Sequence, residues 1–142
     1  MKASEERAMK RGGDDRAGFE IQIEPGQRLM VLRAWGLWSM PLAHECNRAL
    51  FDSYKELGAR GSPWYFLADH SRFPAQAAEI QAEISTTVRD AVKHGMKRSA
   101  SVLGSTVTKL QIRRLTSASG LPMDVFAFFT LEEQALKWLL KT

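Results

Sequence analysis

The chain has 142 residues, of which 44% are hydrophobic and 25% charged, and its formal net charge at pH 7 is +4. A chain of this length can bury a core without a disulfide or a metal, and its composition excludes low-complexity and disulfide-framed classes. Its single cysteine, Cys46, allows no intrachain disulfide, and no stretch approaches the ~20 apolar residues that span a bilayer. We therefore expect a cytoplasmic protein with no transmembrane segment.

The first part of the chain mixes basic and acidic side chains with a Gly-Gly pair and has few apolar residues. Such a segment buries too little apolar surface to offset the entropy of ordering, so we expect a flexible charged tail over 1–17 and one domain over 18–142. Residues 19–24 then alternate apolar and polar side chains, which predicts a half-buried strand. A Pro-Gly turn and the apolar run 28–35 complete a predicted hairpin.

The rest of the chain alternates between helical and strand patterns. A stripe of apolar residues runs from Leu42 to Leu57 at three- and four-residue spacing, which predicts a helix capped by Ser39 and ended by Gly58. Further strands are predicted over 64–69, 99–104 and 125–129, and further helices over 74–95, 106–115 and 130–139, the last with a capping box of Thr130 and Glu133. The order β-β-α-β-α-β-α-β-α predicts an α/β fold with a five-stranded mixed sheet and four helices.

Three stretches carry a family resemblance. They are LADHS at 67–71, GMKRSASV at 95–102, and the aromatic strand FAFF at 126–129 followed by the helix EEQALKWL at 132–139. Together with the element order, they resemble the STAS domains of the anti-sigma factor antagonist type, in particular the stand-alone SpoIIAA-like proteins. The resemblance covers about residues 19–140 and implies a SpoIIAA-like fold and regulation by protein contact, in bacterial-type signalling. Related proteins share their fold with the CRAL-TRIO lipid carriers, so a ligand carrier also stays open.

The resemblance also implies a serine switch. In that family a Ser or Thr in a D-S-S/T-G turn at a helix start is often phosphorylated. This chain reads Asp69-His70-Ser71-Arg72, which keeps an Asp-x-Ser at the strand end but lacks the full motif. A phosphate on Ser71 would add about two negative charges beside Arg72. The competing interpretation is that Asp69 or Ser71 caps the following helix.

Trp35, Trp38 and Met40 crowd the connection between the second strand and the first helix. Because aromatic side chains are enriched at interface hot spots, these residues are candidates for partner or ligand contact. The alternative is that they fill the core between the helix layer and the sheet. An exposed apolar loop here, or an exposed last strand, would also favour a homodimer.

The excess of positive over negative charge is concentrated in residues 89–114, which hold seven basic residues and one acidic residue. Arg89, Lys93 and Lys97 recur every four residues and, with Arg98, form a candidate basic ridge for anionic lipid, nucleic acid or an acidic protein. The alternative is a solvated face that complements a helix dipole. The stretch has no aromatic residues on which bases could stack, so nucleic acid is disfavoured as a partner.

We expect no catalytic residue, metal or cofactor. The three histidines share no metal-ligand spacing with one another or with Cys46, which falls in an apolar helical stripe. The chain has no nucleophile elbow and no glycine-rich phosphate loop. The sequence therefore predicts a non-enzymatic regulatory or scaffold protein that binds a protein partner; the alternative is a carrier or sensor of an apolar or anionic small molecule.

Overall fold

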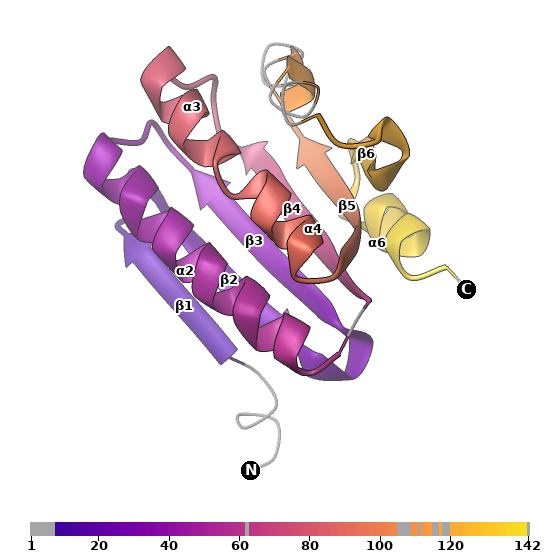
Figure 1. Cartoon of the computed structure of the whole chain (residues 1–142). Helices are drawn as coiled ribbons and strands as arrows, with labels where there is room; N and C mark the ends of the chain where they lie inside the picture. The colour runs from indigo at the N-terminus through magenta and orange to yellow at the C-terminus, as the bar shows by residue number, and fades with distance from the viewer. Residues whose placement is uncertain are drawn as a thin grey trace.

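The computed structural model describes residues 8–61, 63–104, 109–110, 112–114, 117 and 120–141. Its centre is a six-stranded mixed sheet whose strands lie side by side in chain order (Figure 1). The strands are β1 (Ala8–Gly13), β2 (Gly18–Glu24), β3 (Leu29–Trp35), β4 (Trp64–Arg72), β5 (Met96–Leu103) and β6 (Phe126–Phe129). The pairs β1–β2 and β2–β3 are antiparallel, whereas β3, β4, β5 and β6 run parallel to one another.

Helices cover both faces of the sheet. On one face, called the α2 face below, lie α2 (Met40–Ala59), α3 (Ala78–Ser85) and α4 (Val88–Lys93) (Figure 1). On the other face, the α6 face, α6 (Glu132–Leu139) packs against β4, β5 and β6. No helix among the described residues is long and apolar enough to cross a membrane.

The strand β3 is buried on both faces. Met30 and Leu32 belong to the main core under α2, and Leu29 and Val31 belong to a second core that includes Leu139 of α6. Because side chains alternate along a strand, each central strand divides its residues between these two cores. This alternation also decides which polar side chains of β3, β4 and β5 share a face.

The predicted hairpin and first helix are confirmed. A 3-10 turn, η1 (Pro25–Gln27), joins β2 to β3. Ser39 is the N-cap of α2, and its Oγ accepts a hydrogen bond from the amide of Leu42 at 3.4 Å. This contact satisfies one of the free amides at the helix start. The predicted stripe is then buried in the core at Cys46, Leu50, Tyr54 and Leu57.

The sheet has six strands rather than the predicted five, because part of the predicted flexible tail forms β1. β1 pairs with β2 over its whole length, and Nζ of Lys10 donates to Oγ of Ser53 in α2 at 2.9 Å. Gly12 leaves room for the ring of Phe19, which a Cβ would overlap. The few apolar side chains of this segment predicted a flexible tail. An edge strand, however, is held mainly by its backbone hydrogen bonds, which do not depend on apolar side chains. Residues 1–7 lie outside the described part of the chain.

Two predicted helices differ in detail. The helix predicted over 74–95 is divided into α3 and α4 at Thr86 and Thr87, whose hydroxyls donate to the carbonyls of Glu83 and Ile84. These local hydrogen bonds compete with the regular helix.

The capping box of Thr130 and Glu133 does not form. The N-cap of α6 is Leu131, one residue after the predicted N-cap Thr130. A 3-10 turn, η2 (Met123–Val125), precedes β6, and the helix predicted over 106–115 lies largely outside the described residues.

Candidate functional site

A row of alternating charges crosses four strands of the sheet. Arg11 of β1 lies opposite Glu20 of β2, which lies opposite Arg33 of β3, which lies opposite Asp69 of β4. Nη1 of Arg33 donates to Oδ2 of Asp69 at 2.7 Å and to Oε1 of Glu132 in α6 at 2.7 Å. Because opposite charges face each other across each strand pair, the row stabilises this register. It also ties the start of α6 to the centre of the sheet.

Asp69 holds Ser71 in place at the end of β4. Oδ1 of Asp69 accepts hydrogen bonds from the amide of Ser71 at 3.0 Å and from its Oγ at 2.6 Å. Burial alone would raise the pKa of Asp69, but the hydrogen bonds from Ser71 and Arg33 outweigh burial and lower this pKa. Ser71 itself is exposed. The helix-cap interpretation is wrong, since α3 begins only at Ala78 and has no side-chain cap.

Trp35 and Arg72 lie opposite each other at the carboxyl ends of β3 and β4. The Arg72 guanidinium lies 5.8 Å from the centre of the Trp35 ring, and Nε1 of Trp35 donates to the Asp14 carbonyl at 2.8 Å. Trp35 packs beside Gly18, where a Cβ would meet its ring at 2.8 Å. Trp35 is half-buried and Arg72 exposed, so the pair presents a cation stacked on an aromatic face to solvent.

Two shallow cavities adjoin this pair. One of about 260 Å³ and another of about 540 Å³ both include Trp35, Ser71 and Arg72 in their walls. The first also touches Arg33 and Asp69. We refer to these five residues as the carboxyl-edge surface. It matches the edge at which open α/β sheets bind ligands.

The other two residues predicted for partner or ligand contact are core residues. Trp38 is 8% exposed, and its ring packs edge-on against Phe19 and Phe73, with centroids 6.2 and 4.9 Å apart. Met40 is half-buried and packs against the same core. The apolar residue that this loop does expose is Leu37, at 69%. The loop thus contributes Leu37 to the exposed surface.

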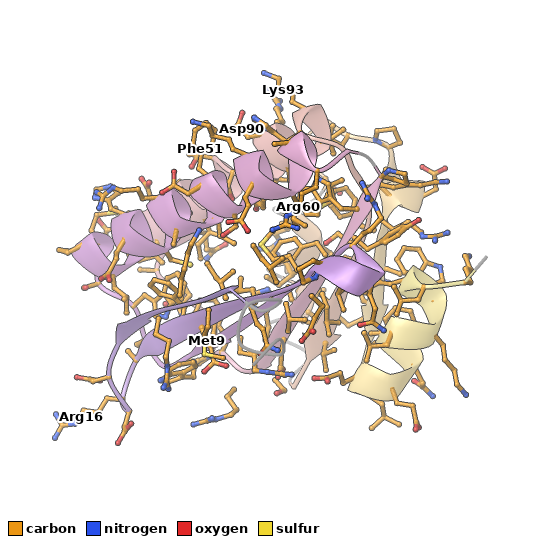
Figure 2. All side chains as sticks on the ribbon, turned by 90° about the horizontal axis from the view of Figure 1, so that it is seen from below. Met9, Arg16, Phe51, Arg60, Asp90 and Lys93 are labelled. Atoms are coloured by element: carbon orange, nitrogen blue, oxygen red, sulfur yellow. The ribbon has the colours of Figure 1, made fainter. Side chains whose placement is uncertain are left out.

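Of the predicted basic ridge, Arg89, Lys93 and Lys97 are exposed, but Lys97 lies with Arg98 in the wall of a cavity that also includes Trp138 of α6. Figure 2 shows Lys93 on the outer side of the molecule, away from α6. Nη2 of Arg98 instead donates to the carbonyls of Leu139 and Lys141 at 2.7 and 3.2 Å, beside α6. β5 begins at Met96 rather than Ser99, so Arg98 lies within the strand and not at a helix end.

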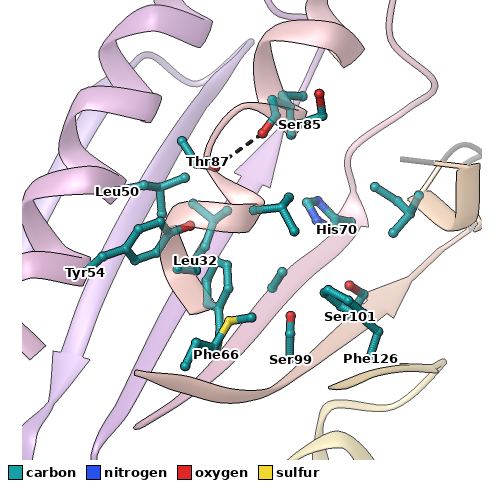
Figure 3. A pocket seen from close by; sticks show the side chains of 16 residues that line it. Leu32, Leu50, Tyr54, Phe66, His70, Ser85, Thr87, Ser99, Ser101 and Phe126 are labelled. Carbon is teal, nitrogen blue, oxygen red and sulfur yellow. Dashed lines mark hydrogen bonds between the residues drawn. The ribbon is translucent and has the colours of Figure 1, made fainter. Parts of the chain in front are cut away.

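A third cavity lies on the α2 face of the sheet and was not predicted. Its volume is about 90 Å³, and its walls include His70 of β4 and Ser99 and Ser101 of β5 (Figure 3). His70 is 8% exposed, and burial lowers its pKa to about 4. Its Nδ1 has no hydrogen-bond partner in the described structure. The sequence did contain a signal for this cavity. Ser99 and Ser101 place polar side chains at alternate positions of β5, and the neighbouring strand β4 contains a single histidine, His70.

No group of three or more His, Cys, Asp or Glu side chains in the described ranges is placed to hold a metal ion. Cys46 is unpaired and buried, and burial raises the pKa of its thiol. A thiol in that state is a weak nucleophile.

Comparison with known proteins gives a structural match. No protein-family model matches the chain, and no curated protein sequence matches it. Among solved structures, the chain is similar to an uncharacterised protein of the DUF3478 family from Shewanella loihica PV-4, which has a SpoIIAA-like fold. The two chains are 16% identical, the match covers 94% of this chain and 93% of the other, and the TM-score is 0.56. The chain therefore has a SpoIIAA-like fold, as the sequence resemblance implied.

Proposed function

We propose that this SpoIIAA-like domain is a non-enzymatic regulatory or scaffold protein that binds a protein partner through its carboxyl-edge surface. The observation that carries the proposal is the stacked pair of Trp35 and Arg72, half-buried and exposed respectively, between two shallow cavities. Tryptophan and arginine dominate the hot spots of protein interfaces. Leu37, in the loop that follows β3, adds exposed apolar area after the end of this strand.

The surface is held in shape before a partner binds. Arg33 bridges Asp69 and Glu132, and Asp69 orients Ser71. A preorganised surface loses less conformational entropy on binding than a mobile one. The charge row therefore supports a binding role for this edge.

A binding role also agrees with the chemistry of Asp69. A catalytic base works best when its pKa lies near the operating pH, whereas hydrogen bonds and Arg33 keep the pKa of Asp69 low. Asp69 would thus be a poor base for activating the Ser71 hydroxyl.

The buried, unpaired Cys46 is consistent with the proposed cytoplasmic location.

Phosphorylation of Ser71 would regulate this contact. A phosphorylated Oγ can no longer donate its proton to Asp69, and about two negative charges would then lie between Asp69 and Arg72. The phosphate would repel Asp69 and attract Arg72 away from Trp35. We expect the modified protein to lose affinity for its partner.

The test is quantitative capture from host cells with the tagged protein and three variants. Trp35→Ala and Arg72→Ala should each reduce capture of a specific partner at least tenfold, whereas Lys93→Ala, an exposed change far from this edge, should not. Circular dichroism should be the same for all four proteins. The proposal fails if capture survives both edge variants. Light scattering of the purified protein shows whether the partner is a second copy, and phosphopeptide mapping shows whether Ser71 is modified.

A further inference from the structure

The cavity on the α2 face is separate from the carboxyl-edge surface and holds an unpaired polar group. His70 projects from β4 into it, and Ser99 and Ser101 enter from the neighbouring β5 (Figure 3). Ala68 lies opposite Ser101, so two small side chains leave space above the sheet at this point. The cavity arises because β4 and β5 carry small residues where the helices above do not fill the gap.

The walls of the cavity are mainly apolar. Leu32, Leu50, Phe66, Ile84, Val88 and Met96 contribute to them. No Asp, Glu, Lys or Arg belongs to the walls within the described ranges. A charged ligand would lose its hydration without a countercharge, which is costly, so the occupant must be neutral.

His70 supplies the polar group that a ligand in this cavity would contact. Its ring is more than nine-tenths buried, and its Nδ1 accepts no hydrogen bond from the described residues. Buried polar groups are nearly always paired, so an orphan of this kind points to a missing partner. Because burial keeps the imidazole neutral at pH 7, Nδ1 is a hydrogen-bond acceptor in the tautomer that carries its hydrogen on Nε2. In that tautomer, the missing partner is a hydrogen-bond donor.

We propose that this cavity binds a compact, neutral, apolar molecule that carries one N–H or O–H group, which donates a hydrogen bond to Nδ1 of His70. The volume of about 90 Å³ is close to that of three water molecules at ~30 Å³ each and below the ~150 Å³ of an apolar cavity that holds benzene. A ligand of about five heavy atoms fits this space. The hydroxyls of Ser99 and Ser101, which form no hydrogen bond with described residues, complete its polar side.

Pyrrole and furan test the proposal on the unmodified protein. Both are neutral five-membered rings of nearly equal size, but only pyrrole has an N–H donor. With protein labelled with ¹⁵N at histidine, pyrrole should shift the His70 Nδ1 resonance saturably and bind about fivefold more tightly than furan, the factor expected for one hydrogen bond. His70→Leu should remove this preference, and Lys93→Ala, outside the cavity, should leave it unchanged.

The proposal is overturned by any of three results. The first is that neither pyrrole nor furan shows saturable binding. The second is that furan binds as tightly as pyrrole to the unmodified protein. The third is that a crystal soaked with pyrrole shows only ordered water beside Nδ1. The first two results need no variant, so they decide the question even if His70→Leu does not fold. They also leave the protein-binding proposal untouched, because the carboxyl-edge surface is tested by different variants.

Discussion

Arg33 and Asp69 lie directly opposite each other on the parallel strands β3 and β4, with 2.7 Å between Nη1 and Oδ2. The same guanidinium nitrogen also donates to Glu132 at 2.7 Å, which joins the sheet to α6. This hydrogen bond, partly offset by burial, raises the pKa of Arg33 further above neutrality. One side chain thus links two parallel strands to the helix that covers them.

Replacement of Arg33 by Met should lower the free energy of unfolding by about 1 kcal/mol at pH 7, a value limited by solvent screening. Because the folded pKa of Asp69 lies below its ordinary 3.8, this stabilisation is present above pH 3.8 and is lost as the pH falls through the folded pKa. Urea unfolding of both proteins at several pH values measures the difference. Arg11→Met is the control, since its longer and more exposed ion pair should contribute less; an equal loss would contradict the prediction.

Replacement of Trp38 by Ala should destabilise the protein by about 3–5 kcal/mol, because it leaves a large cavity between Phe19 and Phe73. Leu37→Ala, one residue away and 69% exposed, should change stability by less than about 0.5 kcal/mol. Chemical denaturation of the two variants measures both values. Similar losses for both would show that Trp38 is not a core residue.

Apolar patterns were sufficient to predict β2 to β6, α2 and α6: β2 alternates, α2 and α6 each bury one stripe, and β3, which is buried on both faces, is a mostly apolar run. They could not predict β1, whose pairing depends on backbone hydrogen bonds to β2 and not on its own side chains. They also could not distinguish Trp35 from Trp38. The burial of Trp38 depends on Phe73, which the fold brings from the end of β4.

The candidate site was predicted in part. Asp69, Ser71, Arg72 and Trp35 do come together, because β3 and β4 are parallel neighbours that end at the same edge. Arg33 was missed, since its partners are 36 and 99 residues away in the chain. The cavity at His70 was missed because it depends on how the helices fit over small residues of β4 and β5, and spacing in a sequence does not report such gaps.

Replacement of Arg98 by Lys should loosen α6 and lower stability by about 1–2 kcal/mol. Lysine lacks the planar group that lies 4.9 Å from the Tyr65 ring and 5.8 Å from the Trp138 ring, and it cannot reproduce the fork toward the Leu139 carbonyl. Hydrogen exchange at the amides of α6 should become faster. Lys97→Arg, at the exposed neighbouring residue, is the control; unchanged exchange in the Arg98 variant would contradict the prediction.

Acid should destabilise the folded chain through His70. Burial lowers its pKa from 6.5 to about 4, against a smaller opposing effect of Asp69, so between these pH values the unfolded chain binds a proton that the folded chain does not. The free energy of unfolding should therefore rise by about 3 kcal/mol from pH 4 to pH 6.5 and then level off. His70→Leu should remove most of this slope, as measured by urea unfolding across the range. An NMR titration of the imidazole with a midpoint near 6.5 in the folded protein would refute the prediction.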